Sequence, residues 1–355
     1  MEKLYSIQYL RACAALLVVV AHAFSHQIGV DNRFVVLAGQ LGVVLFFVIS
    51  GFIMVYISGT GSFSALTFLK RRVIRIVPLY WLFTGLAALL AAFAPSLLKT
   101  TVFTWPHLLQ SLFFIVHEAP GRGGSSPLLS LGWTLNYEAF FYVVFAALAF
   151  LAVTSRVVAL TGLFVAAWIA GLILAPTDPV LQFYLNASPL AFAAGAWIGR
   201  ARLAGNFAPT PLRTGIFVAM AVAGSILFLV DDGGVFSAQL GLIGQVLWAV
   251  GILVLALTFE ERLKRSSLLE KLGDASYALY LSHMFAIGAV TVVAKRLVGS
   301  DGIAEILIVS TISVAFACLV GIVVHQVVEK PLIRFFSGRR RRSEKPFSAV
   351  PATAK

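Results

Sequence analysis

The sequence predicts an all-α polytopic membrane protein with about ten transmembrane helices and one short re-entrant or interfacial segment. Of its 355 residues, 60% are hydrophobic and only 12% are charged, and the mean hydropathy is +0.94. Its 29 phenylalanines outnumber the 15 aspartates and glutamates together. A soluble protein of this size must cover itself with polar side chains, so this composition excludes soluble, disordered and disulfide-rich secreted classes.

Apolar runs of about 20 residues, the length that crosses about 30 Å of hydrocarbon, recur along the chain. The ten predicted helices cover residues 8–28, 36–57, 73–94, 131–153, 157–175, 181–199, 212–230, 240–259, 275–294 and 303–327. The run at 107–117 is too short to span and is the re-entrant or interfacial segment. The Pro-, Gly- and Ser-rich loop at 119–127 is expected to form an outer substrate rim, and 260–272 a helix on the inner surface.

Most basic residues lie on one side of the predicted spans. The chain carries 27 lysines and arginines and a net charge of +12, which in a soluble protein would suggest a nucleic-acid partner. All but five of the 27 fall on the side of both termini, which the positive-inside rule assigns to the cytoplasm. The charge therefore reflects orientation, and no nucleic-acid partner is expected. We expect a single integral-membrane domain at 1–335 and a basic, disordered cytoplasmic tail at 336–355.

Arg11 and His22 lie eleven residues apart in the first predicted span. Eleven steps of about 100° return to within about 20° of the same helix face, about 16 Å along the axis, so both side chains share one stripe. Ionisable groups in a bilayer are costly and are candidates for function, although a packed, hydrogen-bonded histidine is an equal alternative. His26, one turn after His22, lacks a third ligand, and no metal site is expected.

An acidic residue, Glu138, lies in the fourth predicted span. Measured from the outer ends of their helices, Glu138 and His22 lie at nearly the same depth, about 10 Å and about 9 Å. A carboxylate that bonds a histidine fixes its tautomer and makes it a better base. The sequence therefore predicts a general-base pair of His22 and Glu138. Phe141 and Tyr142, one turn further, are expected either to wall its pocket or to pack as ordinary aromatic residues.

Two arginines one turn apart, Arg72 and Arg75, open the third span. Guanidinium pairs bind phosphates well, so we expect them to hold a phosphorylated cytoplasmic ligand, with positive-inside anchoring as the alternative. In the ninth span Tyr280 and His283 share a face, and His283 either lines a ligand channel or bonds a neighbouring helix. In the second span, Ser50 and the glycine after it supply a hydroxyl and a small residue for close helix packing.

Together these residues resemble a known family. They stand in the patterns Arg11-x10-His22, Phe46-Phe47-Val-Ile-Ser-Gly-Phe-Ile-Met54, Arg72-x-x-Arg75 before Pro78-Leu-Tyr-Trp81, Trp133-Thr-Leu-x-x-Glu138-x-x-Phe141-Tyr142, Ser276-Tyr-x-x-Tyr-Leu-x-His283 and Glu329-Lys-Pro331. In this order, over nearly the whole chain, they resemble the acyltransferase-3 family of integral-membrane O-acyltransferases, which modify bacterial surface polysaccharides. The chain looks most similar to short members of the exopolysaccharide or O-antigen acetyltransferase type.

The resemblance implies a multi-pass protein of the bacterial inner membrane with both termini cytoplasmic. It implies acyl-CoA, usually acetyl-CoA, as a co-substrate from the cytoplasm, and no bound cofactor. The acceptor would be a hydroxyl of a glycan or lipid-linked oligosaccharide near the outer leaflet. Catalysis is expected at His22 and Glu138, with His22 as general base or as covalent acyl carrier. The expected donor-binding residues are Arg11, Arg72, Arg75 and His283, and the expected pocket-lining residues are Ser50, Trp133, Asn136, Phe141, Tyr142 and Tyr280.

Two alternative functions use the same polar residues. Intramembrane His, Glu and Arg would equally serve a proton- or anion-coupled transporter, although no inverted repeat is visible. A non-catalytic partner of a polysaccharide export complex would depend on none of them individually. Membrane lipid surrounds the chain in every case, and the sequence leaves open whether it forms a homo-oligomer.

Overall fold

The computed structural model describes residues 4–28, 32–61, 63–98, 101–121, 123–205, 207, 210–229, 235–297 and 302–338. Its α-helices are α1 (Tyr5–Ile28), α2 (Arg33–Ser58), α3 (Ala65–Phe93), α4 (Trp105–Leu112), α5 (Trp133–Ala147), α6 (Val153–Leu174), α7 (Pro179–Tyr184), α8 (Pro189–Leu203), α9 (Pro211–Leu229), α10 (Val235–Thr258), α11 (Ser267–Asp274), α12 (Ser276–Leu297), α13 (Ile303–Val324) and α14 (Lys330–Phe336). Short 3-10 turns lie at Pro95–Leu97 (η1), Ser130–Gly132 (η2) and Glu260–Arg262 (η3), and a π-helical turn, His325–Glu329 (η4), joins α13 to α14. No strand occurs in this part of the chain, and the all-α fold class is confirmed.

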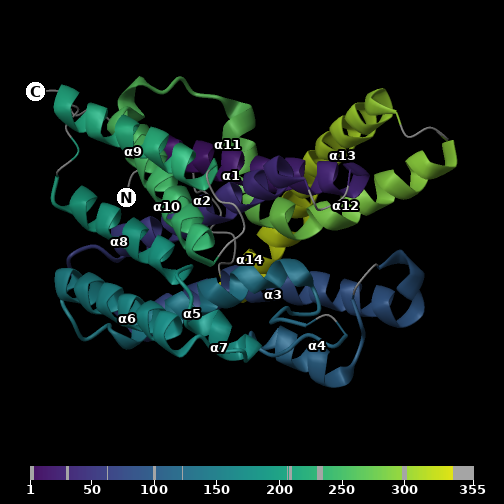
Figure 1. Cartoon of the computed structure of the whole chain (residues 1–355), viewed down its shortest axis with the longest axis horizontal. Coiled ribbons are helices and arrows are strands. Elements are labelled where there is room, and N and C mark those ends of the chain that lie inside the picture. The colour runs from purple at the N-terminus through teal and green to yellow at the C-terminus, as the bar shows by residue number, and fades with distance from the viewer. Residues whose placement is uncertain are drawn as a thin grey trace, which may run out of the picture.

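Helix α1 lies within one group of helices. It packs against α2, α10, α11, α12 and α13, which lie in one half of the molecule in the view of Figure 1, whereas α3 to α7 lie in the other half. Helix α2 packs on α1 and α10, and also on α5 and α8. One face of α2 therefore meets helices from both halves.

Seven helices of the described residues are long and apolar enough to cross a membrane. They are Tyr5–Ile28, Val35–Ser58, Ala65–Phe93, Val153–Leu174, Gly241–Thr258, Ser276–Ala294 and Ile303–Phe336. The other three predicted spans also form helices, but shorter ones: α5, α8 and the apolar segment Pro211–Leu227 of α9. Helix α14 ends at Phe336, and the predicted basic tail lies outside the described residues from 339 onward.

Helix α5 ends at Ala147, six residues before the predicted end of that span. The guanidinium of Arg156, at the start of α6, donates hydrogen bonds to the carbonyls of Leu148, Ala149 and Leu151. These bonds satisfy carbonyls that a longer helix would have bonded internally, and a cation is favourable at this end of the helix dipole. Arg156 is 3% exposed and lies over the Phe63 ring at 4.1 Å. It is a structural residue, although in the sequence it counts only as topological charge.

The predicted span at 181–199 is broken into α7 and α8. The Asn186 side chain accepts a hydrogen bond from the Ser188 backbone N–H and donates to the carbonyls of Gln182 and Phe183. Pro189 then opens α8. Pro189 has no backbone N–H to donate to the preceding helical turn, and the Asn186 side chain offers the backbone an alternative to helix bonds. The chain therefore turns here instead of continuing as one helix.

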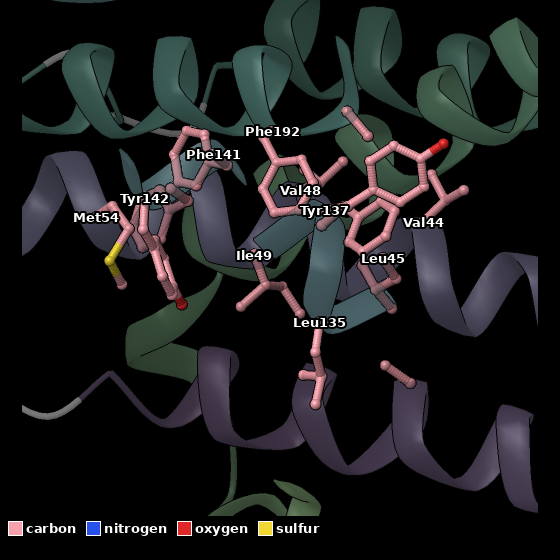
Figure 2. Close-up of a cluster of buried hydrophobic side chains, with 14 of the residues drawn as sticks. Val44, Leu45, Val48, Ile49, Met54, Leu135, Tyr137, Phe141, Tyr142 and Phe192 are labelled. Atoms are coloured by element: carbon pink, nitrogen blue, oxygen red, sulfur yellow. The ribbon is translucent and has the colours of Figure 1, made fainter. Parts of the chain in front are cut away.

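Helices α2 and α8 approach each other closely through glycine. A Cβ on Gly51 would stand 2.0 Å from the Phe192 carbonyl oxygen, and a Cβ on Gly195 would stand 1.9 Å from that of Val48. Both distances are below any tolerable contact, so only glycine allows this crossing. Gly51, the small residue after Ser50, thus allows close helix packing, as the sequence predicts. Beside the crossing, Phe192 stacks on Phe141 with ring centroids 4.8 Å apart, as Figure 2 shows.

The predicted inner-surface helix at 260–272 is the turn η3 followed by α11. The Glu260 carboxylate in η3 accepts hydrogen bonds from the backbone N–H groups of Tyr5 (2.6 Å) and Ser6 (3.0 Å). These are the first residues of α1, whose N–H groups have no partner within the helix, and a negative charge is favourable at that end of the dipole. A residue 255 positions away thus caps α1, which no local sequence pattern indicates.

We predict that Gly195→Ala lowers the thermal unfolding temperature of the protein in detergent or lipid. The added methyl group forces the α2 and α8 backbones apart and costs about 1–3 kcal/mol, the usual range for overpacking. The measurement is a thermal unfolding curve followed by intrinsic fluorescence.

Gly162→Ala on α6 is the matched control, because a Cβ there would meet nothing within 4 Å. It should leave stability unchanged or raise it slightly, since alanine favours a helix over glycine by about 0.5–1 kcal/mol. Equal unfolding temperatures for the two variants would contradict the close crossing.

Candidate active site

Five helices enclose a cavity of about 360 Å³ that contains three arginines. We call it the arginine cavity. Its lining comes from α1, α2, α3, α5 and α12: Gln8, Arg11, Val43, Phe46, Phe47, Ile49, Ser50, Ile53, Met54, Ile57, Arg72, Arg75, Ile76, Thr134, Leu135, Glu138, Tyr142, Ser276, Tyr277 and Tyr280. The predicted donor-binding residues Arg11, Arg72 and Arg75 are therefore brought together, and Ser50, Tyr142 and Tyr280 lie with them.

The three arginines differ in how they are held. Arg11 donates to the Ser276 hydroxyl at 2.8 Å and to the Gln8 side-chain oxygen at 3.3 Å. Arg72 has a buried Nε without a hydrogen-bond partner in the described part of the chain, and its guanidinium lies 5.9 Å from the centre of the Phe68 ring. Neither Arg72 nor Arg75 forms an ion pair with a described carboxylate. A buried donor without a partner is costly, so this cavity favours an anionic ligand.

Glu138 faces the arginine cavity rather than His22. Its carboxylate accepts hydrogen bonds from the Ser50 hydroxyl at 2.9 Å and from the Tyr142 hydroxyl. These are its hydrogen-bond partners among the described residues, so the predicted direct pair of His22 and Glu138 is wrong. The rise per residue predicts how deep each side chain lies from the end of its helix, but it does not predict how the helix is rotated about its axis. In the structure, the rotation of α5 turns Glu138 toward α2.

His22 lies on a second cavity, of about 490 Å³, which we call the histidine cavity. Its lining consists of Val18, Ala21, His22, Ser25, Val35, Val36, Gly39, Gln40, Val43, Gly123, Gly124, Ser125, Ser126, Ser130, Leu131, Trp133 and Tyr280. The loop expected as a substrate rim thus contributes Gly123 to Ser126, beside His22. Volume and lining are typical of small-molecule sites, which are mostly apolar with a few polar groups.

Hydrogen bonds define which nitrogen of His22 carries a proton. The His22 Nδ1 atom lies 2.9 Å from the Val18 carbonyl oxygen, which can only accept, so Nδ1 must carry the hydrogen. The same atom lies 3.3 Å from His283 Nε2. His283 Nδ1 in turn donates to the Tyr280 carbonyl at 2.7 Å, which leaves His283 Nε2 as an acceptor. His22 Nε2 is then unprotonated and makes no hydrogen bond with the described residues.

His283 does not line either cavity. Its side chain is fully buried, and its ring centroid lies 5.0 Å from that of His22. The side chain that contacts the His22 ring is therefore His283, whereas the depth argument from the sequence had placed Glu138 there. Of the two alternatives for His283, bonding a neighbouring helix is the one that the structure has.

Two predicted pocket residues lie elsewhere. Phe141 is fully buried and stacks on Phe192, because α5 turns this face to α8 (Figure 2). Asn136 is 5% exposed, and its Oδ1 has no partner in the described part of the chain. Neither lines a cavity, whereas Trp133 lines the histidine cavity. Helical spacing relative to Glu138 placed Phe141 on the wrong side of α5, and the family resemblance that suggested Asn136 does not fix where its side chain points.

Sequence reasoning missed Val43 and Gln8, which carry no chemical signal of their own. His325 Nδ1 and Glu329 Oε2 lie 2.6 Å apart within the π-helical turn η4 and form a pair away from both cavities. No cluster of three or more His, Cys, Asp or Glu residues that could hold a metal ion occurs among the described residues.

The predicted short segment at 107–117 anchors the rim of the histidine cavity. It forms α4, whose Ser111 hydroxyl accepts a hydrogen bond from the Leu128 backbone at the end of that loop. His117 Nδ1 donates to the Ile115 carbonyl at 2.7 Å, so its Nε2 accepts a hydrogen bond from His107 Nδ1 at 2.8 Å. Both imidazoles are buried, and this contact requires a lone pair on His117 Nε2.

An α-helical membrane body, with one cavity lined by three arginines and a neighbouring cavity lined by His22, defines a polytopic membrane protein with a candidate site between its helices. The acyltransferase domain family, acyltransferase-3, matches residues 4–324. The chain therefore belongs to this family of membrane acyltransferases. It is an enzyme that transfers acyl groups, which separates it from the transporter and export-partner alternatives.

Two relatives cover nearly the whole chain. The exopolysaccharide production protein ExoZ of Rhizobium meliloti (strain 1021) is 39% identical over 318 residues, which are 86% of this chain and 92% of ExoZ. The acyltransferase MdmB of Streptomyces mycarofaciens is 27% identical over 388 residues, covering 99% of this chain and 96% of MdmB. No solved structure matches the chain.

We predict that the segment 105–128 opens more readily as the pH falls from about 6.5 to about 4. Burial, with a smaller contribution from neighbouring His117, lowers the pKa of His107 to about 4. An opened segment has an ordinary histidine pKa of about 6.5 and takes up a proton that the closed segment refuses, so acid favours opening. The measurement is amide hydrogen exchange of this segment, corrected for intrinsic rates.

His107→Gln should flatten this pH dependence, because the amide does not titrate. Exchange in α6, which carries no histidine, is the internal control. A wild-type profile that stays flat between these pH values would show that the histidine pair does not hold the loop.

Proposed function

We propose that the protein transfers an acetyl group from cytoplasmic acetyl-CoA to a hydroxyl of an exopolysaccharide or other cell-surface sugar. The observation that carries the proposal is the unprotonated Nε2 of His22, which lines a cavity directly adjacent to the arginine cavity. A base at one cavity and phosphate-binding groups at the other are the two requirements of an acyl-CoA-dependent O-acyltransferase. The name of ExoZ supports an exopolysaccharide acceptor.

The donor enters the arginine cavity from the cytoplasm. Arg72 and Arg75, with Arg11 beside them, bind its phosphates, and the unpartnered Nε of Arg72 supports this assignment. Both termini face the cytoplasm in this orientation, and the membrane is the bacterial inner membrane. Glu138, held by Ser50 and Tyr142, offsets part of the positive charge when no donor is bound.

The reaction is a direct transfer. The sugar hydroxyl donates its proton to His22 Nε2 as its oxygen attacks the thioester carbonyl carbon. The new C–O ester bond forms, the C–S bond breaks, and the leaving thiolate takes the proton from His22 to become the free thiol. His283 accepts from His22 Nδ1 and so acts as a positioning residue that favours the reactive tautomer.

We predict that His22→Ala lowers kcat by about 100- to 10,000-fold with little change in the KM for acetyl-CoA, because a general base contributes this much and does not touch donor phosphate. The assay uses the purified chain in lipid nanodiscs with acetyl-CoA and deacylated saccharides from cells that make the protein. Thiol release and ester formation are both measured.

Two variants sharpen this test. His283→Asn should lower kcat and alter its pH profile while the donor KM stays unchanged, whereas His26→Ala, which lines neither cavity, should retain activity. Full acetylation activity in the His22→Ala variant would show that His22 is not the general base. No transfer by the wild type from any acyl-CoA to any of the saccharides would refute the donor and acceptor classes.

We also predict that Arg72→Gln and Arg75→Gln raise the KM for acetyl-CoA by about tenfold each, because each removes a charge-assisted bond to phosphate. Neither should change the KM for S-acetylpantetheine, which carries no phosphate. Arg71→Gln, at an exposed neighbouring position, is the control. An equal loss with both donors would show that the arginines do not bind phosphate.

A further inference from the structure

One face of α2 lines both cavities. Residues Val36, Gln40 and Val43 face the histidine cavity, and Val43, Phe47, Ser50 and Met54 face the arginine cavity. Their spacing of three or four residues keeps them on one side of the helix, over about 27 Å of its axis. The two cavities are therefore consecutive parts of one track along α2.

The track is interrupted at a single place. Among the described residues, Val43 and Tyr280 line both cavities, so these two side chains separate one from the other. Val43 comes from α2 and Tyr280 from α12, so two different helices contribute to the boundary. We call this pair the Val43–Tyr280 constriction.

Tyr280 is held firmly in the constriction. Its hydroxyl makes hydrogen bonds with the Thr134 hydroxyl at 2.8 Å and with the Leu131 carbonyl at 3.1 Å. Thr134 lines the arginine cavity and Leu131 lines the histidine cavity, so the ring is fixed exactly at the boundary of the two. Its ring also packs edge-on against Phe46, with centroids 6.2 Å apart.

The reacting thioester must lie at this boundary, an argument that rests on the proposed function. Its phosphate end is bound in the arginine cavity, but its carbonyl carbon must come within bonding reach of a hydroxyl beside His22 in the histidine cavity. The alkyl part of the acyl group extends from that same carbon. It therefore occupies the space between Val43 and Tyr280, where every added methylene meets a fixed side chain.

We infer that the Val43–Tyr280 constriction selects the length of the acyl group, so that Val43 is a specificity-determining residue that restricts the donor to acetyl and other very short acyl thioesters. A close-packed pocket discriminates about 10- to 200-fold for each methylene that it cannot accommodate. Val43→Ala removes two methyl groups and so makes room at the constriction for a longer acyl chain.

The experiment compares kcat/KM for acetyl-CoA and butyryl-CoA, with the purified chain in nanodiscs and the same deacylated saccharides. Wild type should prefer acetyl-CoA. Val43→Ala should raise the ratio of butyryl to acetyl transfer by about tenfold or more, and Val43→Ile should lower it. The matched control is Val44→Ala, which removes the same atoms from the next residue of α2, at a buried core position outside both cavities.

Equal butyryl-to-acetyl ratios in wild type, Val43→Ala and Val44→Ala would overturn the inference while leaving the acyltransferase proposal intact. A wild type that uses both donors equally well would also overturn it. Absence of transfer from every acyl-CoA would overturn the proposed function and the inference together, and this result is recognised because no ratio can then be formed. Opposite shifts in the alanine and isoleucine variants distinguish selection at Val43 from a general loss of folding.

Discussion

An ionised side chain inside a bilayer must be paired, solvated or placed in a cavity, because hydrocarbon supplies neither hydrogen-bond partners nor opposite charges. Arg11, Arg72, Arg75 and Glu138 meet this constraint by facing one enclosed space between five helices. The arrangement of the helices follows from it: α1, α2, α3, α5 and α12 each contribute polar groups to that space. The same concentration of charge that would be costly in lipid thus lies in a cavity instead.

The tautomers of His22 and His283 are defined by two backbone carbonyls. The carbonyls of Val18 and Tyr280 each take a hydrogen from one imidazole, and together they direct the lone pair of His22 Nε2 away from both. Neither carbonyl changes charge, so the histidine pair has a defined protonation state without a nearby carboxylate. Glu138 instead faces the arginine cavity, where its carboxylate accepts hydrogen bonds from the Ser50 and Tyr142 hydroxyls.

The fold class could be predicted from the sequence because apolar length is a local property. Arg11, Arg72, Arg75, Ser50 and Tyr142 line one cavity, as expected of polar groups that must share a space inside a membrane, whereas most of the apolar lining carries no signal in the sequence. The prediction from the sequence paired His22 with the wrong residue, because axial depth does not fix helix rotation. The capping of α1 by Glu260 and the hydrogen bonds of Arg156 to the carbonyls after α5 could not be predicted from the sequence either, because both depend on contacts between separate elements.

The glycine crossing of α2 and α8 has a mechanical consequence. Backbone contacts at Gly51 and Gly195 prevent α2 from sliding or rotating without a clash, so Val43 is carried on an immobile support. On the α12 side, Tyr280 is held by hydrogen bonds of its hydroxyl to Thr134 and to the Leu131 carbonyl. Both walls of the passage are therefore anchored to the helix framework, so its width depends on the packing of the helices rather than on free side-chain rotation.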